Sequence, residues 1–278
     1  MKIVVPMAGT GNRFVQKGYQ DPKPLIEVNN KRIIEYILDM FSENDEFVFI
    51  CNETHLKETN MRETLYGLNP HAQIVSMPQH KLGPVYTVKS AYEFIEDEEP
   101  VIISYCDNPF LWNYRDFLSF VECENLDGCI LTHTGFHPHT LSATKMAYLR
   151  ESDGLLKEIK EKESYTEDPM SEHASTGAYY FKRGGDLKKY FDLAIEKDLS
   201  YNGEYYVTLV YNLLAKDDLR VGYYDAPYIT VFGTPAEVEN FEAWCTILEG
   251  AQIKDETDLI KTYRYWKEYH EKSNICRH

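Results

Sequence analysis

The sequence predicts an α/β fold, in which helices flank a mixed β-sheet and a small β-rich subdomain is attached. In the first half of the chain, short apolar runs alternate with amphipathic segments, as in a parallel sheet with crossover helices. From Gly128 onward, strand-like runs and turn residues follow one another more closely, which indicates the β-rich part. With 278 residues, 43% of them hydrophobic, the chain is long enough to bury a core of its own.

Four strands and three helices are expected in the first half. Apolar runs predict strands at 3–5, 46–51, 73–77 and 100–105. A 3.6-residue periodicity predicts helices at 32–41, 55–66 and 85–95. Open α/β sheets bind ligands at the carboxyl ends of their strands, so the segments that follow these strands are the first candidates for a site.

The second half is expected to mix strands with helices. Apolar runs predict strands at 128–133, 145–150, 177–181, 219–224 and 228–232. Asp153 and Gly154 predict a hairpin turn between two of the strands. Helices are expected at 186–199, 205–215 and 235–249. The last of them is marked by Thr234 as its cap and by Pro235 at its first position.

Residues 1–250 are expected to form a single domain, because the sequence has no internal repeat and no long linker. A polar helix that carries several aromatic side chains is expected within 251–278, as a C-terminal appendage. Its aromatic residues could cover a neighbouring subunit, which would give a homo-oligomer, or they could pack on their own domain.

The net charge of −16 argues against a nucleic-acid partner, because no basic stripe offsets the acidic background. The longest apolar runs fall far short of the ~20 residues that a membrane span needs, and the N-terminal residues do not read as a signal peptide. The six cysteines are scattered, without a Cys-x-x-Cys pair, and are expected to be reduced. We therefore expect a cytoplasmic protein without nucleic-acid or membrane partners.

A glycine-rich segment follows the first expected strand. Gly9 and Gly11 allow a sharp turn that brings backbone N–H groups close to a phosphate, and Arg13 adds a bidentate positive charge. A dinucleotide-binding loop would need a third glycine where Phe14 stands, and a P-loop would need Gly-Lys-Ser/Thr, which is absent. A turn that binds no ligand remains an alternative at this point.

Lys23 lies between Pro22 and Pro24, which exclude a helix on either side of it. A lysine that is held in this way loses little conformational entropy when it binds an anion. In combination with the glycine-rich segment, it indicates a site suited to phosphoryl chemistry rather than a generic anion site.

Together, Ala8-Gly9-x-Gly11-x-Arg13-Phe14 and Pro22-Lys23-Pro24-Leu25 resemble the signature of sugar-1-phosphate nucleotidyltransferases, also called nucleotide-sugar pyrophosphorylases. The resemblance extends roughly from residue 3 to residue 242. It implies a Rossmann-like mixed sheet of the nucleotide-diphospho-sugar transferase type. It also implies a nucleotide-binding half at 1–127 and an acceptor-binding half at 128–250, which contains the small β-rich subdomain.

The resemblance further assigns roles to individual residues. Nucleotide binding is implied for Ala8, Gly9, Thr10, Gly11, Asn12, Gln79, Leu82 and Gly83. Acceptor binding is implied for Glu161, Lys162, Gly177 and Glu204. The implied catalytic residues are Arg13, Lys23 and Asp107. Asp107 is also the implied ligand of Mg²⁺, a cation that prefers carboxylate, phosphate and water oxygens.

Such an enzyme joins a nucleoside monophosphate from a nucleoside triphosphate to a sugar 1-phosphate, or a similar phosphomonoester, and releases pyrophosphate. An anionic oxygen of the acceptor attacks the α-phosphorus in line, so the protein must position the reactants and neutralise their charge, and no general base is needed. Arg13 would hold the triphosphate, Lys23 would bridge the reacting phosphates, and Lys162 would hold the acceptor phosphate. The expected product serves the synthesis of glycan or capsule precursors.

Several of these residues also have a purely structural interpretation. Asp107 could cap a turn, Lys162 lies in a charged run of the kind that usually faces water, and Glu204 could favour a helix start. In better-known family members an aspartate two residues before the Gly-Thr turn is a second metal ligand, but Val231 holds that position here. Asp225 lies close in the sequence but is not aligned with it. Either Asp107, phosphates and water hold the metal, or another acid substitutes.

Three histidines, His133, His137 and His139, lie on a segment that contains Gly and Pro, and in principle they could hold a zinc ion. Their spacing matches no common zinc pattern, and a loop that borders the acceptor pocket is the alternative. His173 would face the same pocket if the resemblance holds.

Other activities remain open. A cytidylyltransferase that acts on a phosphorylated amine, polyol or amide would share these features. A nucleotide-sugar-dependent glycosyltransferase would need an Asp-x-Asp-like motif where the chain has Asp107-Asn108-Pro109, and it would leave Lys23 without a role. A catalytically inactive nucleotide-sugar sensor is disfavoured, because Arg13, Lys23 and Asp107 are all retained. Neither the base of the nucleotide nor the acceptor follows from the sequence.

Overall fold

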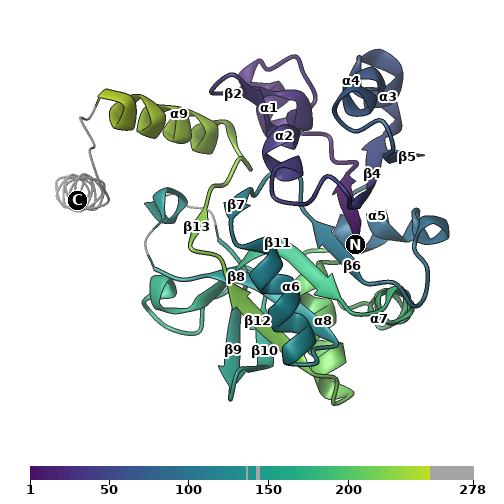
Figure 1. The fold of residues 1–278 in the computed structure, drawn as a ribbon. Helices are drawn as coiled ribbons and strands as arrows, with labels where there is room; N and C mark the ends of the chain where they lie inside the picture. Colours follow the sequence, from purple (N-terminus) through teal and green to yellow (C-terminus); the bar gives the residue numbers. More distant parts are fainter. Residues whose placement is uncertain (136, 142–144, 251–278) are drawn as a thin grey trace.

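A computed structural model describes residues 1–135, 137–141 and 145–250 of the chain (Figure 1). A nine-stranded mixed sheet runs through both halves, with the strand order β5-β4-β1-β6-β11-β8-β12-β10-β9. The predicted α/β fold is therefore confirmed. The helix expected within 251–278 lies outside the described residues. Of the helices in the described ranges, none is long and apolar enough to cross a membrane.

The first half builds the parallel part of the sheet. Its four main strands are β1 (Lys2–Met7), β4 (Glu46–Asn52), β5 (Gln73–Met77) and β6 (Val101–Ser104). The helices are α1 (Asn12–Lys17), α2 (Ile33–Leu38), α3 (Glu53–Glu58), α4 (Met61–Leu68), α5 (Gly83–Lys89) and α6 (Tyr114–Cys123). Short elements are η1 (Lys23–Leu25), β2 (Glu27–Val28), β3 (Lys31–Arg32), η2 (Tyr92–Phe94) and β7 (Phe110–Leu111).

Two of the expected helices differ from the structure, and α1 and α6 were not predicted. The single helix expected at 55–66 is wrong, because Thr59 is extended and separates α3 from α4. The helix expected at 85–95 ends at Lys89 and is followed by the 3-10 turn η2. The signal for α6 was present in the sequence: Asn113 caps it by accepting a hydrogen bond from the backbone N–H of Asp116.

The second half adds the antiparallel part of the sheet. Its strands are β8 (Gly128–His133), β9 (Tyr148–Ser152), β10 (Leu155–Lys160), β11 (His173–Phe181), β12 (Val221–Asp225) and β13 (Tyr228–Ile229). Its helices are η3 (Pro138–Leu141), η4 (Pro169–Ser171), α7 (Gly184–Glu196), α8 (Val207–Lys216) and α9 (Pro235–Gly250). Asp153 and Gly154 form the predicted hairpin turn, with φ angles of 55° and 78°.

Strand β11 joins the two halves, because it pairs antiparallel with β6 on one side and with β8 on the other. Strand β9 pairs with β10 and also with the first residues of β11. The strands β11, β8, β12, β10 and β9 therefore close into a ring of pairings, which is the β-rich part expected from the sequence.

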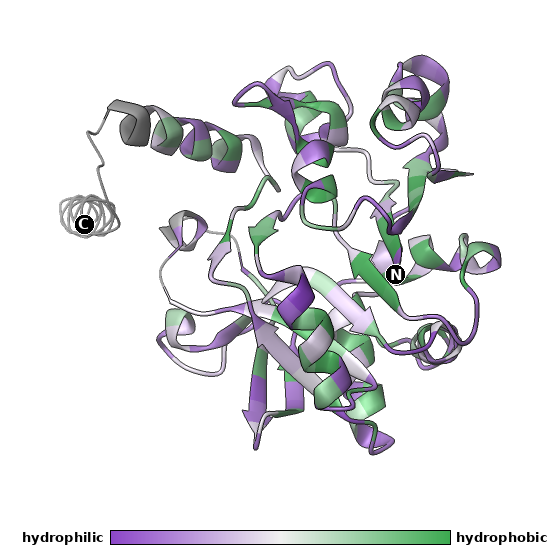
Figure 2. Ribbon diagram, viewed as in Figure 1, coloured by the Kyte–Doolittle hydropathy of each residue, from purple (hydrophilic) through white to green (hydrophobic). Residues whose placement is uncertain are grey.

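Helices cover both faces of the sheet (Figure 1). The core on one face contains buried residues of α5, α7 and α8, and the core on the other face contains buried residues of α2, α4 and α6. In Figure 2, β6 has a strongly apolar colour, and apolar and polar bands alternate along the helices. A third cluster includes Phe14, Phe232 and Val238 and connects α1 to α9.

Candidate active site

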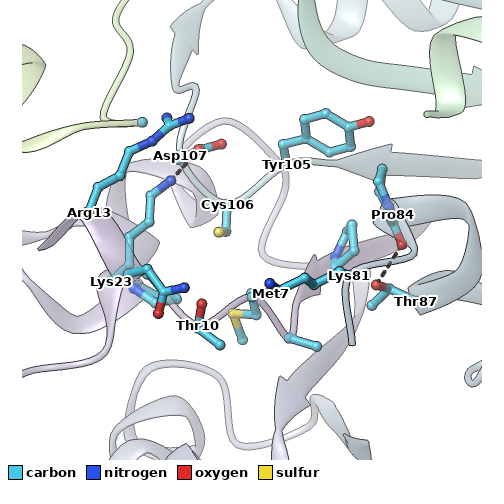
Figure 3. Close-up of a pocket in the computed structure, with 18 of the residues that line it drawn as sticks. Met7, Thr10, Arg13, Lys23, Lys81, Pro84, Thr87, Tyr105, Cys106 and Asp107 are labelled. Carbon is cyan, nitrogen blue, oxygen red and sulfur yellow. Dashed lines mark hydrogen bonds and ion pairs between the residues drawn. The ribbon is translucent and has the colours of Figure 1, made fainter. Parts of the chain in front are cut away.

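A cavity of about 630 Å³ opens where β1 and β6 end (Figure 3). Its walls come from six parts of the chain: the glycine loop after β1, the turn around Lys23, the loop before α5, the end of β6, Glu204 and Gly233. The predicted site residues that line it are Ala8, Gly9, Thr10, Gly11, Asn12, Arg13, Lys23, Gly83, Asp107 and Glu204. Residues more than 200 positions apart in the sequence thus share one cavity.

The glycine loop is held on both sides. On one side, the buried amide of Asn52 donates a hydrogen bond to the carbonyl of Ala8, at 3.2 Å. On the other side, Gly11 has a φ of 63° and caps α1, and the ring of Phe14 is buried in the third core cluster. An added Cβ at Gly11 would lie 3.4 Å from the Cβ of Lys23, so the loop touches the lysine turn. The sequence reasoning missed Asn52, which positions the loop.

Gly9 permits a test that separates ligand binding from folding. Its backbone lies outside the left-handed region, and an added Cβ would meet no protein atom within 4 Å. We therefore expect Gly9→Ala to change the free energy of unfolding by less than about 0.5 kcal/mol. Turnover should fall about a hundredfold, because the methyl group would keep phosphates from the loop amides. Thermal melting and a pyrophosphate-release assay measure the two effects.

The matched control is Gly67→Ala in α4, where an added Cβ also meets open space. We expect this variant to keep full activity and to gain about 0.5–1 kcal/mol, because alanine favours a helix interior. Normal turnover in Gly9→Ala would show that no ligand approaches the loop at this position.

Lys23 and Asp107 form an ion pair inside the cavity (Figure 3). Lys23 is the first residue of the short 3-10 turn η1 and lies between Pro22 and Pro24. Leu25, the last residue of this turn, is buried in the core. Burial alone would lower the pKa of Lys23, but the neighbouring carboxylate of Asp107 outweighs it and the pKa is raised. The ammonium group therefore stays charged inside the cavity.

The cavity concentrates positive charge in an acidic protein. Three cations line it, Arg13, Lys23 and Lys81, against two carboxylates, Asp107 and Glu204. In Figure 3, Arg13, Lys23 and Asp107 gather at one end, whereas Lys81 lies nearer to the opposite end. Clustered cations of this kind favour a highly charged anion such as a triphosphate. The sequence reasoning did not select Lys81.

Cys106 also lines the cavity, next to Asp107. Burial raises the pKa of its thiol to about 12, so the thiol is protonated at neutral pH. A protonated thiol is a poor nucleophile, so Cys106 is not suited to attack a substrate.

The loop before α5 is fixed by contacts with the second half of the chain. Gly83 has a φ of 84°, and an added Cβ there would lie 2.7 Å from the backbone nitrogen of Tyr205. The backbone N–H of Tyr205 donates to the carbonyl of Leu82, at 2.9 Å, and that of Val85 donates to the carbonyl of Tyr205, at 3.1 Å. Only glycine fits this approach. Leu82 and Gln79 do not line the cavity, so their roles in nucleotide binding stay predictions.

His80, another residue that the sequence reasoning missed, fixes the same loop. Its Nδ1 accepts a hydrogen bond from the backbone N–H of Leu82, at 3.1 Å, and its Nε2 lies 3.1 Å from the hydroxyl of Thr87. Since Nδ1 accepts, the neutral ring carries its proton on Nε2 and donates to Thr87. Burial lowers the pKa of His80, which favours this neutral form.

Two of the predicted acceptor residues are linked through a tyrosine. The ammonium group of Lys162 donates to the hydroxyl of Tyr206, at 2.6 Å, and this hydroxyl donates to Glu204, at 2.9 Å. Lys162 also lies over the ring of Tyr206, 4.6 Å from its centre. Lys162 therefore has specific partners and is not simply solvated. Glu204 lines the cavity, whereas Lys162 does not.

The other two predicted acceptor residues lie behind the cavity wall. Gly177 has a φ of 87°, and an added Cβ would lie 2.9 Å from Asn108 and 3.0 Å from the ring of Tyr105. It therefore allows β11 to approach the end of β6. Glu161 is buried and accepts a hydrogen bond from the hydroxyl of Thr208, at 2.6 Å, and burial raises the pKa of its carboxyl group.

The position of the expected second metal ligand is apolar in the structure as well. Val231 is buried within the core that also contains α2, α4 and α6. The carboxylate of Asp225 accepts hydrogen bonds from Thr132, at 2.6 Å, and from His173, at 2.9 Å. Burial would raise the pKa of Asp225, but these two hydrogen bonds outweigh it and the pKa is lowered. Asp225 is thus engaged in the second half of the chain and does not line the cavity.

The three histidines of the β8 segment pack together. The ring centres of His133 and His137 are 4.8 Å apart, and those of His133 and His139 are 5.0 Å apart. Burial lowers the pKa of His133 to about 2 and that of His139 to about 3, so both rings are neutral. Within the described ranges, no group of three or more His, Cys, Asp or Glu side chains is arranged to hold a metal ion. The zinc interpretation is therefore not supported.

These buried histidines predict that the protein loses stability in mild acid. A folded-state pKa below the ordinary histidine value of 6.5 means that only the unfolded chain takes up the proton, so stability falls as pH drops below 6.5. His133 and His139 each contribute up to about 1.4 kcal/mol of loss between about pH 7.5 and about pH 5.5, and His137, whose pKa burial also lowers, acts in the same direction. Glu161, whose pKa is raised, acts in the opposite direction. Equal urea midpoints at the two pH values would contradict the burial of these rings.

Comparison with known proteins extends over most of the chain. The sequence profile of the MobA-like NTP transferase domain matches residues 3–167. The bifunctional protein GlmU of Clostridioides difficile (strain 630) is 25% identical over 228 residues, which are 80% of this chain and 46% of GlmU. The chain thus spans about half the length of the curated relatives it matches.

Solved structures share the fold at low sequence identity. The nucleoside-diphosphate-sugar pyrophosphorylase of Vibrio cholerae RC9 is 21% identical and superposes with a TM-score of 0.69, covering 87% of this chain and 99% of its own. The inositol-1-phosphate CTP transferase of T. maritima is 15% identical, with a TM-score of 0.64, and covers 86% of this chain and 94% of its own.

Proposed function

The chain belongs to the family of MobA-like NTP transferase domains, and from this premise we propose that it is a nucleotidyltransferase that acts on phosphorylated small molecules. It would join a nucleoside monophosphate from a nucleoside triphosphate to a sugar 1-phosphate or a similar phosphomonoester and release pyrophosphate. A role in the synthesis of glycan or capsule precursors, in the cytoplasm, is part of this proposal.

The observation that carries the proposal is the ion pair between Lys23 and Asp107, at the end of a cavity lined by the glycine loop. The lysine is only 17% exposed and the aspartate 22%, so both charges are largely withdrawn from water before any ligand binds. Burying a charge pair is costly unless the charges interact with something more than each other. Phosphate oxygens for the lysine and a cation for the carboxylate would provide that interaction.

The residues around the Lys23–Asp107 ion pair would have different roles in the reaction. Arg13 and the amides of the glycine loop would hold the triphosphate, and Lys23 would stabilise the charge that develops on the reacting phosphates. Glu204 and Lys162, linked through Tyr206, would orient the acceptor, so that its phosphate oxygen meets the α-phosphorus in line. The acceptor oxygen is already ionised, and therefore the site needs no general base.

Asp107 is the residue that would hold Mg²⁺, and the space beside it fits a small cation. Gly233 lines the cavity, and a Cβ at this position would lie 3.8 Å from Oδ2 of Asp107. The absence of a side chain therefore keeps the region next to the carboxylate open. When bound there, Mg²⁺ would neutralise charge on the phosphate oxygens.

A cytidylyltransferase that acts on a non-sugar phosphate is the second candidate. The similarity to the inositol-1-phosphate CTP transferase of T. maritima supports this second candidate, and this similarity is one of fold. A glycosyltransferase is less well supported, because its reaction needs no acceptor phosphate that Lys23 could bridge to the nucleotide.

A matrix assay tests the proposal. Each nucleoside triphosphate is combined with hexose 1-phosphates and with phosphomonoesters of amines, polyols and amides, in the presence of Mg²⁺, and pyrophosphate release is measured. We expect release that depends on both substrates, with one nucleotide and one acceptor class preferred. If no pair releases pyrophosphate, the proposal is wrong.

A further inference from the structure

Gly233 lies where two carboxylates converge. A Cβ at this position would be 3.1 Å from Oε2 of Glu237 and 3.8 Å from Oδ2 of Asp107. Both oxygens therefore border the same small space, which any side chain at position 233 would enter. Since Gly233 itself lines the cavity, this space adjoins the site where the triphosphate would bind.

Helix α9 brings Glu237 to this place. The backbone N–H of Phe232 donates to the carbonyl of Asp107, at 2.7 Å, so the segment before the helix runs alongside the end of β6. Phe232 and Val238 are buried in the third core cluster, which fixes the first turn of α9. Glu237 is only 4% exposed, and its side chain is therefore confined to the inner side of that turn.

We propose that Glu237 supplies the second carboxylate of the divalent-cation site, in place of the acid that is missing at Val231. The inference rests on the proposed nucleotidyl transfer, which requires such a cation. With oxygens from Asp107 and Glu237, phosphate and water oxygens would complete the all-oxygen coordination that Mg²⁺ prefers. The acid would come from the first turn of α9 and not from position 231, two residues before Gly233, where the sequence has a valine.

A purely structural role for Glu237 makes a different prediction. The hydroxyl of Thr234 donates to Oε2 of Glu237, at 3.0 Å, and the backbone N–H of Glu237 lies 3.3 Å from that hydroxyl. This is a helix cap, and caps contribute to stability alone. If Glu237 only completes the cap, then removing either partner should lower stability and leave metal binding unchanged.

The experiment is a titration of the full chain with Mn²⁺, followed by electron paramagnetic resonance, in the presence of inorganic pyrophosphate. Mn²⁺ is a spectroscopic substitute for Mg²⁺, and pyrophosphate supplies the phosphate oxygens without a choice of base. We expect Glu237→Gln to weaken Mn²⁺ binding on the order of tenfold or more, as Asp107→Asn should. The readout does not depend on turnover.

Two control variants separate the alternatives. Thr234→Val removes the cap partner and should lower the melting temperature while keeping Mn²⁺ affinity. Glu239→Gln makes the same chemical change two residues further along α9, on a side chain that is 53% exposed and paired with Lys17, and it should change neither quantity. If Glu237→Gln binds Mn²⁺ as the wild type does, or if the wild type binds none, the proposal is overturned. Failure of the nucleotidyl transfer proposal would instead be seen as Mn²⁺ binding without turnover of any substrate pair.

Discussion

Lys23→Ala is expected to reduce pyrophosphate release about a thousandfold, or below detection, because no other described cation pairs with Asp107 inside the cavity. Lys23 stabilises the charge that develops as the α-phosphorus is attacked. Its removal should therefore lower kcat much more than the affinity for nucleotide. Steady-state kinetics with saturating substrates, and nucleotide binding by calorimetry, measure the two effects separately.

The matched control for this variant is Lys17→Ala. Lys17 lies in α1, just beyond the glycine loop, but its side chain is 60% exposed and pairs with Glu239 on the surface. Exposed pairs of this kind contribute about 0–1 kcal/mol to stability, so the control should keep both its fold and its activity. If Lys23→Ala keeps full activity, then Lys23 has a structural role and no catalytic one.

Asp107→Asn is expected to keep the fold and to lose Mg²⁺-dependent turnover, by on the order of a hundredfold or more. An amide has nearly the same shape as the carboxylate and can still accept a hydrogen bond from Lys23, but it offers a divalent cation no negative charge. Turnover measured across a range of Mg²⁺ concentrations, together with far-UV circular dichroism, checks both parts of the expectation.

Asp192→Asn provides the control for the loss of a Lys–Asp pair as such. Asp192 accepts a hydrogen bond from Lys89 at 2.6 Å, but it is 51% exposed and lies on α7. We expect this variant to behave as the wild type. If Asp107→Asn turns over normally at saturating Mg²⁺, then Asp107 only caps the turn after β6.

The parallel half of the sheet could be read from the sequence because its signals are local. The strand predicted at 73–77 has the observed bounds of β5, and the strand at 46–51 differs from β4 by one residue. Apolar runs are typical of strands in parallel sheets, and β4 is buried from Phe47 to Asn52, so this pattern needs no knowledge of the rest of the fold. The glycine loop and the braced Lys23 are local in the same sense, and both lie on the cavity wall.

What the sequence did not provide depends on side-chain hydrogen bonds, one of them local and the others between distant segments. The helix expected at 55–66 is interrupted at Thr59, whose hydroxyl bonds to the carbonyl of His55, and periodicity alone does not register that competition. Asn52 and Tyr206 enter the site only through partners 44 residues away, Ala8 and Lys162. Such pairs exist only once the sheet has formed.

The second carboxylate illustrates the same limit. The sequence left open whether another acid replaces the one missing at Val231, and the only nearby acid that it singled out was Asp225, which is not aligned with that position. The structure distinguishes Asp225 from Glu237. Asp225 is bonded to Thr132 and His173, whereas Glu237, which is bonded to Thr234, lies beside Gly233, where an added Cβ would also come close to Asp107.

The central claim is that an acceptor phosphate oxygen attacks the α-phosphorus of a bound triphosphate. An acceptor whose phosphate carries ¹⁸O tests it most directly, with the products of the preferred substrate pair identified by mass spectrometry. The account predicts that the nucleotide product retains all of the ¹⁸O and that the released pyrophosphate carries none. Release of a nucleoside diphosphate, or ¹⁸O in the pyrophosphate, would contradict it.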